Sequence, residues 1–338
     1  MEYILNETPL KTTNSFKINN IKMDFNYKKT NFNKYEINNL DSYKEEIIDS
    51  FNSKIGYSDE KCYRLIIDIM ESISEPIIIN YNFTKDNNYL TSEIIINLFE
   101  NTSSNIFITF SSKINSFNNV KIVTNSKDNS KSNISVINLL NDESTSLVSF
   151  ENNLEDNSDI IHNFIDIGGK NKISNYYSNL NGNYSANYFN NIYIGKNNDL
   201  IDMNYYMSFR GVNNKGNIIS EGALNDYSNK SFKGTIDFLE GSKKSDGNEL
   251  ENCLLLSENA KSKSLPMLLC HEEDVIGNHG ISVGKIDSEK LFYLETRGLS
   301  EEDSIKAIIK SNFNKVLDNI KCKKIKDEIL EIIDKIII

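Results

Sequence analysis

Residues 265–298 read LPMLLCHEEDVIGNHGISVGKIDSEKLFYLETRG, the stretch of the 338-residue chain that is densest in chemically reactive side chains. It holds two of the three histidines, His271 and His279, together with Cys270 and an acidic run. Gly277 and Gly280 flank His279, and glycine adopts backbone conformations that other residues resist. We therefore expect a turn here that holds His279 on a fixed loop rather than within a packed face.

The residues before this stretch alternate between short β-rich runs and polar turns. The runs lie at 77–83, 93–99, 105–110, 120–124, 134–139, 146–150, 160–167, 191–194, 203–210, 217–220, 234–239 and 254–256. More than ten strands without a helical period predict an all-β body, which is a sandwich, a barrel or a parallel β-helix. Periodicity does not choose among these, although Asn and Ser in most turns suit the side-chain ladders of a solenoid.

Patterns at both ends of the chain differ from this body. Alternation at Ile21, Met23, Phe25 and Tyr27 predicts a strand, and apolar spacings of three and four predict amphipathic helices at 41–51 and 58–73. At the other end, helices are predicted at 288–296, from about 300 to 320, and at 324–338. We therefore divide the chain into an N-terminal strand and helical region (1–76), a β core (77–286) and a C-terminal helical region (287–338).

The caps of the C-terminal helices can be read from single residues. Asp287 is a suitable N-cap for the first, and Gly298 suits its C-terminal stop. Ser300 with Asp303 forms a capping-box-like start for the second.

Five short motifs in this region occur in a fixed order with almost no gaps: EEDV at 272–275, NHG at 278–280, VGKID at 283–287, LFYL at 291–294 and RG at 297–298. Further motifs lie upstream at 166–169, 233–238 and 254–257. Together they make the C-terminal half of the chain resemble the SufB/SufD family, the paired scaffold proteins of the SUF system for iron–sulfur cluster assembly. The N-terminal third resembles the family only through LNETP at 5–9. The resemblance implies that the β core is a right-handed parallel β-helix, with N-terminal and C-terminal helical segments.

The resemblance also implies a site. SufD members place a histidine in the His-Gly turn near the interface with SufB, where the cluster forms, and this residue corresponds to His279. Many of them have a cysteine where this chain has Gly277, so Cys270 is the candidate substitute. Imidazole and thiolate both suit iron. Asn278 before the histidine and Gly280 after it favour SufD over SufB, whose members carry an acid-His-Glu order.

Each of these residues has a structural alternative. A lone histidine in a turn is usually a hydrogen-bonded surface group, and Cys270 is equally well explained as a packed thiol. His271, beside the acidic run, is expected to be solvated. The remaining histidine and cysteines are interpreted as strand or packing residues: His162, Cys62, Cys253 and Cys322.

The sequence has no glycine-rich phosphate loop ending in Gly-Lys-Ser/Thr, so we expect a non-catalytic scaffold subunit and assign ATP hydrolysis to a partner. In the family the C-terminal helical region holds the SufC ATPase. The residues expected to contact it are Leu291, Phe292, Tyr293, Arg297, Ile305 and Ile309. The resemblance further implies pairing with a SufB-like paralogue or, in its absence, with a second copy of the chain. No tightly bound cofactor is expected, only transient iron or an iron–sulfur cluster at the subunit interface.

Composition excludes several other classes of function. A net charge of −11 and a pI near 5.0 argue against a sequence-independent grip on nucleic acid. Four dispersed cysteines without a Cys-x-x-Cys pair, an acid at position 2 and no long apolar run predict a cytoplasmic protein without signal peptide or membrane span. Two alternatives remain: a carbohydrate-active β-helix of the secreted type, and a purely structural interaction module.

Overall fold

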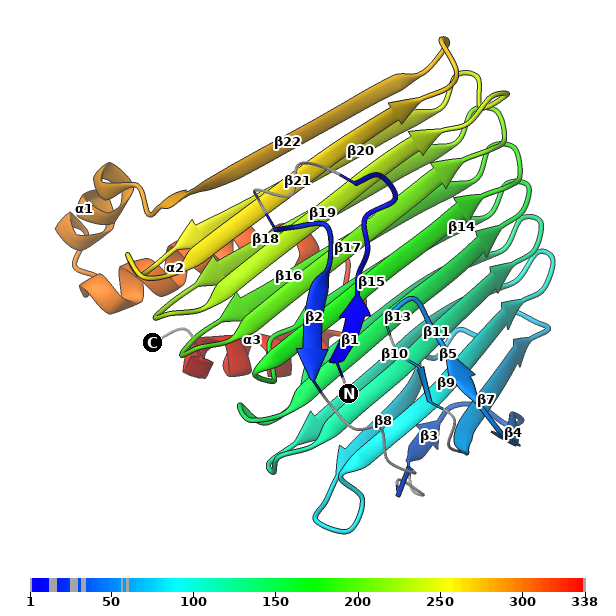
Figure 1. Ribbon diagram of the computed structural model, residues 1–338, viewed down its shortest axis with the longest axis horizontal. Coiled ribbons are helices and arrows are strands. Elements are labelled where there is room, and N and C mark those ends of the chain that lie inside the picture. The colour runs from blue at the N-terminus through cyan, green and yellow to red at the C-terminus, as the bar shows by residue number, and fades with distance from the viewer. Residues whose placement is uncertain are drawn as a thin grey trace.

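The computed structural model describes residues 2–11, 17–24, 30–31, 35–55, 57–58 and 61–336. Most of them form two nine-stranded sheets that face each other (Figure 1). From β7 onwards the chain alternates between the sheets, and neighbouring strands within a sheet are parallel. The body is a β-solenoid of about 8 turns, which confirms the expected parallel β-helix.

We call the two large sheets sheet 1 and sheet 2. Sheet 1 contains, in spatial order, β22 (Ile276–Lys285), β20 (Asp246–Leu255), β18 (Lys215–Leu224), β16 (Ala186–Gly195), β14 (Asp159–Asp166), β12 (Lys131–Leu139), β10 (Ser103–Ser112), β8 (Ile77–Phe83) and β3 (Glu36–Asn38). Sheet 2 contains β21 (Lys261–Cys270), β19 (Asn229–Phe238), β17 (Leu200–Phe209), β15 (Asn171–Leu180), β13 (Thr145–Leu154), β11 (Phe117–Ser126), β9 (Tyr89–Leu98), β7 (Cys62–Ile69) and β4 (Lys44–Ile48).

Smaller elements lie at the two ends of the chain. Two short antiparallel pairs are β1 (Glu2–Leu5) with β2 (Ile21–Asp24), and β5 (Phe51–Asn52) with β6 (Tyr57–Ser58). The helices are α1 (Ser288–Thr296), α2 (Glu301–Leu317) and α3 (Lys323–Ile336). None of these three helices combines the length and the apolar character that crossing a bilayer requires.

Asparagine residues connect successive coils at the turns. Asn101, Asn129 and Asn157 have φ values of 60°, 59° and 55°, a left-handed conformation that asparagine tolerates better than most residues. The backbone N–H of each donates a hydrogen bond to a carbonyl group of the next coil, at 2.9 to 3.0 Å. Left-handed asparagine residues therefore join successive coils at these turns.

A ladder of side chains also runs across the strands of sheet 2. In it each amide donates a hydrogen bond of 2.7 to 3.2 Å to the side chain one coil earlier. Its members are Asp68, Asn97, Asn125, Asn153 and Asn179. The ladder satisfies polar groups that the stacked coils partly bury.

The interior of the solenoid is packed with inward-pointing apolar side chains, many of them fully buried. Aromatic rings stack from coil to coil, as in the contact of Tyr176 with Phe189, whose centroids lie 3.9 Å apart. This continuous core, which we call the lumen, buries one face of every strand and holds the coils together.

The helices α2 and α3 cover the outer face of sheet 1. Ile309 and Phe313 of α2 are buried in one cluster with Phe107, Ile165 and Ile192 of the sheet. By contrast α1 buries none of its residues and extends beyond the end of β22 (Figure 1). The three predicted helices, the last of them through Ile336, and the caps at Asp287 and Ser300 are confirmed, while residues 337–338 lie outside the described residues.

The two helices predicted in the N-terminal region are wrong. Residues 44–48 form β4, and residues 62–69 form β7, which pairs antiparallel with β4 and parallel with β9. Leu65, Ile67 and Ile69 are buried at alternate positions of β7. A run this rich in isoleucine fits both the helical and the strand period, and the edge of β9 decides the outcome. The strand predicted at 21–27 is confirmed as β2 through Asp24, while Phe25 and Tyr27 lie outside the described residues.

Candidate functional site at the open end of the solenoid

The last coil of the solenoid consists of β21 and β22. Among the described strands, each has a neighbour on one side only, β19 and β20 respectively. The far edges of these strands therefore present backbone N–H and C=O groups without strand partners. The inward-facing side chains of this coil are also accessible, because no further coil covers them. We call this region the open end.

His279 lies in the middle of β22, where it pairs in register with Glu249 of β20. Neighbouring residues in parallel strands point to the same side of the sheet, and Glu249 is fully buried in the lumen. His279 therefore faces the lumen from the last coil, while it remains exposed to solvent. Among the described residues no hydrogen bond or ion pair engages its imidazole.

The prediction that glycine holds His279 in a turn is wrong. Gly277 and Gly280 are strand residues, and neither has a positive φ. A Cβ atom at Gly277 would lie 2.9 Å from side-chain atoms of Leu268 and Phe238, closer than packed atoms approach. Glycine is needed there for packing across the lumen, so the histidine is held by a strand.

Glu249 has no partner for either carboxylate oxygen among the described residues, although its side chain is fully buried. Its carboxyl group lies against Gly234 of β19, where a Cβ atom would approach Oε1 to 2.1 Å. Burial, followed by the nearby charge of Glu251, raises the pKa of Glu249 to about 8. A buried carboxyl group of this kind carries a proton or binds a cation.

Behind Glu249 the lumen contains a fully buried ion pair between Lys230 and Glu251. Glu251 also accepts hydrogen bonds from the hydroxyl groups of Tyr193 at 2.9 Å and Ser264 at 2.6 Å. Cys253, in the same strand as Glu251, is buried, and burial raises the pKa of its thiol. The lumen therefore contains a buried polar group near the open end. The sequence analysis missed this polar group.

Cys270 is exposed at the end of β21, in register with Phe238. Leu268 and Gly277 face each other across the lumen between the positions of Cys270 and His279. No three His, Cys, Asp or Glu side chains in the described part of the chain converge into a metal-binding group. Cys270 and His279 therefore share the open end without forming a ready-made cluster site.

The other histidines and cysteines behave largely as expected. His271 is exposed and lies 3.8 Å from Asp237. His162 is buried in β14, where its Nδ1 lies 3.0 Å from the hydroxyl group of Tyr176, and burial lowers its pKa to about 3. Cys62 is a packed thiol, in a strand rather than the predicted helix, and Cys322 is partly buried.

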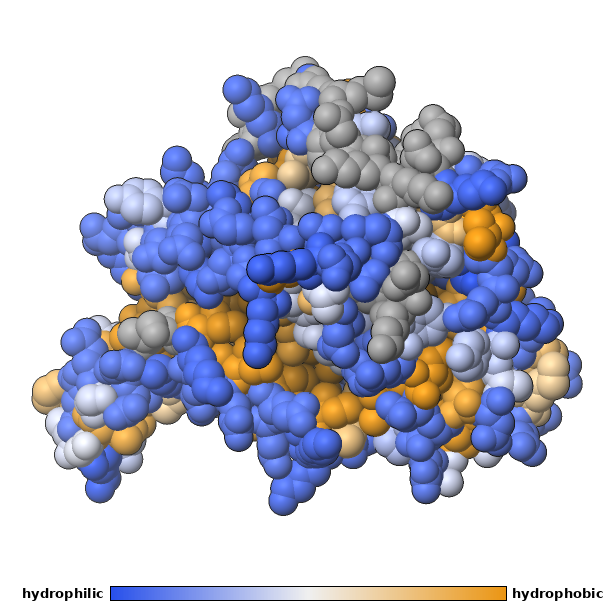
Figure 2. All heavy atoms as spheres, turned by 90° about the horizontal axis from the view of Figure 1, so that it is seen from below, coloured by the Kyte–Doolittle hydropathy of each residue, from blue (hydrophilic) through white to orange (hydrophobic). Residues whose placement is uncertain are grey.

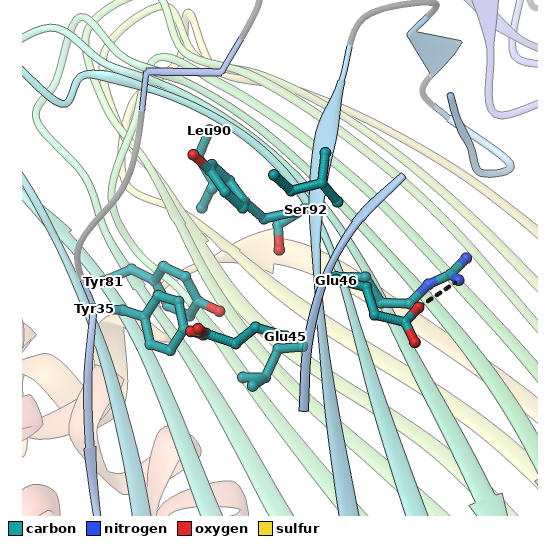
Figure 3. A pocket seen from close by; sticks show the side chains of 10 residues that line it. Tyr35, Glu45, Glu46, Tyr81, Leu90 and Ser92 are labelled. Carbon is teal, nitrogen blue, oxygen red and sulfur yellow. Dashed lines mark hydrogen bonds and ion pairs between the residues drawn. The ribbon is translucent and has the colours of Figure 1, made fainter. Parts of the chain in front are cut away.

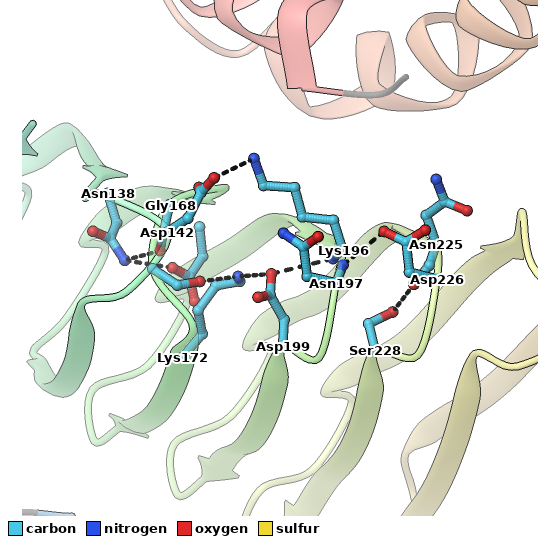
Figure 4. A network of polar contacts seen from close by, with 12 residues as sticks. Asn138, Asp142, Gly168, Lys172, Lys196, Asn197, Asp199, Asn225, Asp226 and Ser228 are labelled. Atoms are coloured by element: carbon cyan, nitrogen blue, oxygen red, sulfur yellow. Dashed lines mark hydrogen bonds and ion pairs between the residues drawn. The ribbon is translucent and has the colours of Figure 1, made fainter. Parts of the chain in front are cut away.

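A second buried charge network surrounds the motif at 166–169 (Figure 4). Lys172 Nζ lies 2.8 Å from Asp199 Oδ2 and also donates to the carbonyl group of Gly169. Asn138 donates to Asp166 at 2.7 Å, whose pKa is raised to about 6 by burial. Every member has a partner here, so this motif organises the turn between β14 and β15.

A groove of about 590 Å³ lies between α1 and α2. Beside it Phe292 and Tyr293 are 67% and 56% exposed, and the guanidinium group of Arg297 lies 5.2 Å from the ring centroid of Tyr293. Ile309, predicted to contact a partner, is instead fully buried against sheet 1, and Ile305 and Leu291 are partly buried. The accessible part of the predicted contact surface is thus Phe292, Tyr293 and Arg297.

At the opposite end of the solenoid a cavity of about 280 Å³ is lined by Tyr35, which precedes β3, and by residues of β4, β7, β8 and β9 (Figure 3). The rings of Tyr35 and Tyr81 lie together in it, with centroids 5.1 Å apart, and Tyr35 donates to Glu45. Viewed from below, hydrophobic residues are visible in a recess bordered by hydrophilic ones (Figure 2). The contacts of Tyr35 with Tyr81 and Glu45 lie over the first coils.

Comparison with known proteins decides the family. Residues 81–312, more than half of the chain, match the sequence-family model described as "SUF system FeS cluster assembly, SufBD core domain". The chain belongs to the SufBD core family.

Curated members of this family align with part of the chain. The Bacillus subtilis iron–sulfur cluster assembly protein SufD is 28% identical over 125 residues, which cover 37% of this chain and 29% of that protein. The Escherichia coli SufD protein is 27% identical over 169 residues, 50% of this chain and 40% of its own length. A SufBD family protein of Pyrococcus horikoshii is 30% identical over 165 residues, 48% and 36% of the two chains. The matched region thus spans less than half the length of each of these relatives.

The SufBD core match includes the open end and the α1–α2 groove. His279 and Glu249 both fall within residues 81–312, as do α1 and most of α2. The N-terminal cap with β3, β4 and β7, and the helix α3, lie outside the matched region. The site described above is therefore built on the family's core.

Proposed function

We propose that this SufBD core protein is a SufD-like, non-catalytic scaffold subunit for iron–sulfur cluster assembly in the cytosol. Membership of the family and the two relatives named SufD support it. The observation that carries the proposal is the position of His279, which faces the lumen at the open end and is accessible from outside. An imidazole there can donate a nitrogen lone pair to iron that arrives as cargo.

The open end is also the proposed site of subunit pairing. Strand edges without partners are commonly covered by another chain, and a subunit docked on β21 and β22 would enclose His279 together with its cargo. The partner is a SufB-like chain, or a second copy of this chain where none is present. Cys270 would then lie at the rim of the same interface. A strictly monomeric mass in light scattering, with and without a SufB-like partner, would contradict this pairing.

A SufC-like ATPase is assigned to the surface formed by Phe292, Tyr293 and Arg297. Exposed aromatic residues next to an arginine are typical of binding hot spots. Removing all residues after 298 is a poor test, because α2 covers Ile165 and Ile192. Phe292→Ala with Tyr293→Ala should instead abolish capture of the ATPase. Glu328→Ala in α3 is the control, since Glu328 is exposed and lies outside this surface. Unchanged capture by the double variant would move the docking site elsewhere.

The role of His279 is tested by His279→Ala in cells that lack the native gene. Because the side chain is exposed, the substitution should cost about 1 kcal/mol of stability or less. Maturation of an iron–sulfur client should nevertheless fall sharply, since alanine offers no ligand atom. His271→Ala is the matched control, because His271 is exposed and lies in the turn that precedes β22, the strand of His279. Equal maturation by both variants, with equal melting temperatures, would remove His279 from the mechanism.

A further inference from the structure

Glu249 is a buried carboxyl group near the open end for which the surrounding side chains provide no compensating partner. Its side chain is fully buried, yet neither carboxylate oxygen has a hydrogen-bond partner among the described residues. An unpaired buried carboxylate costs several kcal/mol unless a proton or a cation compensates it. Such a group in a folded protein therefore indicates a ligand or a function.

The cations near Glu249 are already engaged. Lys230 lies inside the lumen, and its ammonium group pairs with Glu251. Lys233, the neighbour of Gly234 in β19, points to the outer face of sheet 2, where it binds Asp202 at 2.6 Å and the backbone carbonyl of Asn6. No ion pair in the described part of the chain includes Glu249. Compensation therefore comes either from a proton on Glu249 itself or from a cation outside the chain.

The direction from which a cation can reach Glu249 is set by the solenoid. On the lumen side Glu249 lies against the backbone of Gly234, and on its outward side the next residue in register is His279. Adjacent strands in a sheet lie about 4.8 Å apart, so a carboxylate and an imidazole on neighbouring strands can reach the same ion. His279 is exposed, and so connects the buried carboxyl group with solvent.

We propose that the carboxylate of Glu249 and the imidazole of His279 together bind one divalent transition-metal ion of the iron class at the open end of the solenoid. This inference deepens the proposed function and rests on it. A carboxylate oxygen and an imidazole nitrogen suit Fe²⁺, while the absence of a third converging ligand within the described residues leaves positions for water or for a facing subunit. His279 captures the ion from solvent, and Glu249 anchors it from within the lumen.

The proposed site has only two protein ligands among the described residues. Such a site is suited to holding cargo iron before it is passed on.

Anaerobic titration of the full-length chain with Co²⁺, followed by its visible d–d absorbance, tests the proposal. Isothermal titration with Fe²⁺ provides a second measurement. Wild type should bind one ion, and Glu249→Gln and His279→Ala should each weaken binding about tenfold or more, since even outer-shell changes cost 10–100-fold. Glutamine preserves the size of Glu249 but is a poor metal ligand. Thermal melting of both variants verifies that they are folded.

The controls are His271→Ala and Glu273→Gln, because both residues are exposed in the turn next to the open end. Both variants should bind Co²⁺ like wild type. A folded Glu249→Gln variant that binds Co²⁺ with wild-type affinity would overturn the proposal, and so would a wild-type chain that binds no ion. If His279→Ala still impairs client maturation in either case, the proposed function stands without the Glu249 site. If both ligands prove necessary for Co²⁺ but maturation is normal, the metal site is real and the proposed function fails.

Discussion

Lys230 and Glu251 form an ion pair inside the solenoid, and neither side chain is exposed to solvent. The pair bridges two successive strands, because Lys230 belongs to β19 and Glu251 to β20. Tyr193 and Ser264 donate further hydrogen bonds to the same carboxylate. A buried pair of this kind adds little net stability compared with apolar residues, but breaking it leaves one charge without compensation.

Lys230→Met should therefore destabilise the protein by roughly 3–5 kcal/mol, since Glu251 would remain charged and buried. Lys230→Met combined with Glu251→Gln should recover part of that loss. Urea denaturation at neutral pH measures both. Lys285→Met is the control, because Lys285 pairs with Glu258 at 2.9 Å on the surface, and exposed pairs contribute about 0–1 kcal/mol. Equal losses for the two single variants would show that burial of the pair is unimportant.

Asn125 occupies the middle of the ladder on sheet 2. It donates to Asn97 at 2.9 Å and accepts from Asn153 at 3.2 Å. Asn125→Ala removes both hydrogen bonds in a partly buried setting and should cost about 1–3 kcal/mol in urea denaturation. Asn278→Ala, which removes one exposed bond of 2.8 Å to Asn248, should cost about 0.5 kcal/mol or less. A smaller loss at Asn125 than at Asn278 would contradict a stabilising ladder.

The solenoid was predictable from the sequence only in part. Strand spacing and asparagine-rich turns indicated an all-β body, but the resemblance chose the parallel β-helix among three architectures. The C-terminal helices were predictable because Asp287 and Ser300 are strong N-caps. The strand β7 was not, since its apolar spacing at Leu65, Ile66 and Ile69 also fits a helix face and only the neighbouring strand decides.

The site was harder to predict than the fold. His279 was identified, but its flanking glycines indicated a turn, whereas in the solenoid they make room for side chains from the opposite sheet. Glu249 was missed because β20 reverses the usual alternation: Leu250 is 46% exposed while Glu249 and Glu251 face inwards. Only the register of adjacent strands, which joins residues about 30 positions apart, brings Glu249 next to His279.

Asn6 fastens the β1–β2 hairpin to the outer face of sheet 2. Its amide donates to the carbonyl groups of Ser174 and Asp202 at 2.9 and 3.1 Å, and to the Asp202 carboxylate at 2.7 Å. Asn6→Ala loses these bonds and also places alanine at a φ of 52°, which alanine resists. Amide hydrogen exchange in residues 2–5 and 21–24 should accelerate strongly. Exchange in β10, which belongs to sheet 1 on the other side of the lumen, should not change. Acceleration spread evenly over the solenoid would contradict a local fastening.

Glu249 should also make stability depend on pH. Its pKa in the folded chain is about 8, against an ordinary value of 4.5, so between these two pH values the folded state holds a proton that the unfolded state has released. Stability contributed by this group is therefore complete below about pH 4.5 and is lost as the pH rises towards 8, by at most about 1.4 kcal/mol per pH unit.

Glu249→Gln cannot titrate, so its stability relative to wild type should rise by on the order of a few kcal/mol between pH 5 and pH 8. Other buried groups, including Asp166 with its pKa of about 6, are common to both proteins and cancel in the difference. Urea denaturation of both proteins at several pH values in metal-free buffer measures this difference directly. A difference that stays constant across the range would mean that the Glu249 carboxyl group is solvated or paired in solution. Added Co²⁺ should stabilise wild type most at the alkaline end, where the carboxylate is free of its proton, and should leave the glutamine variant much less affected.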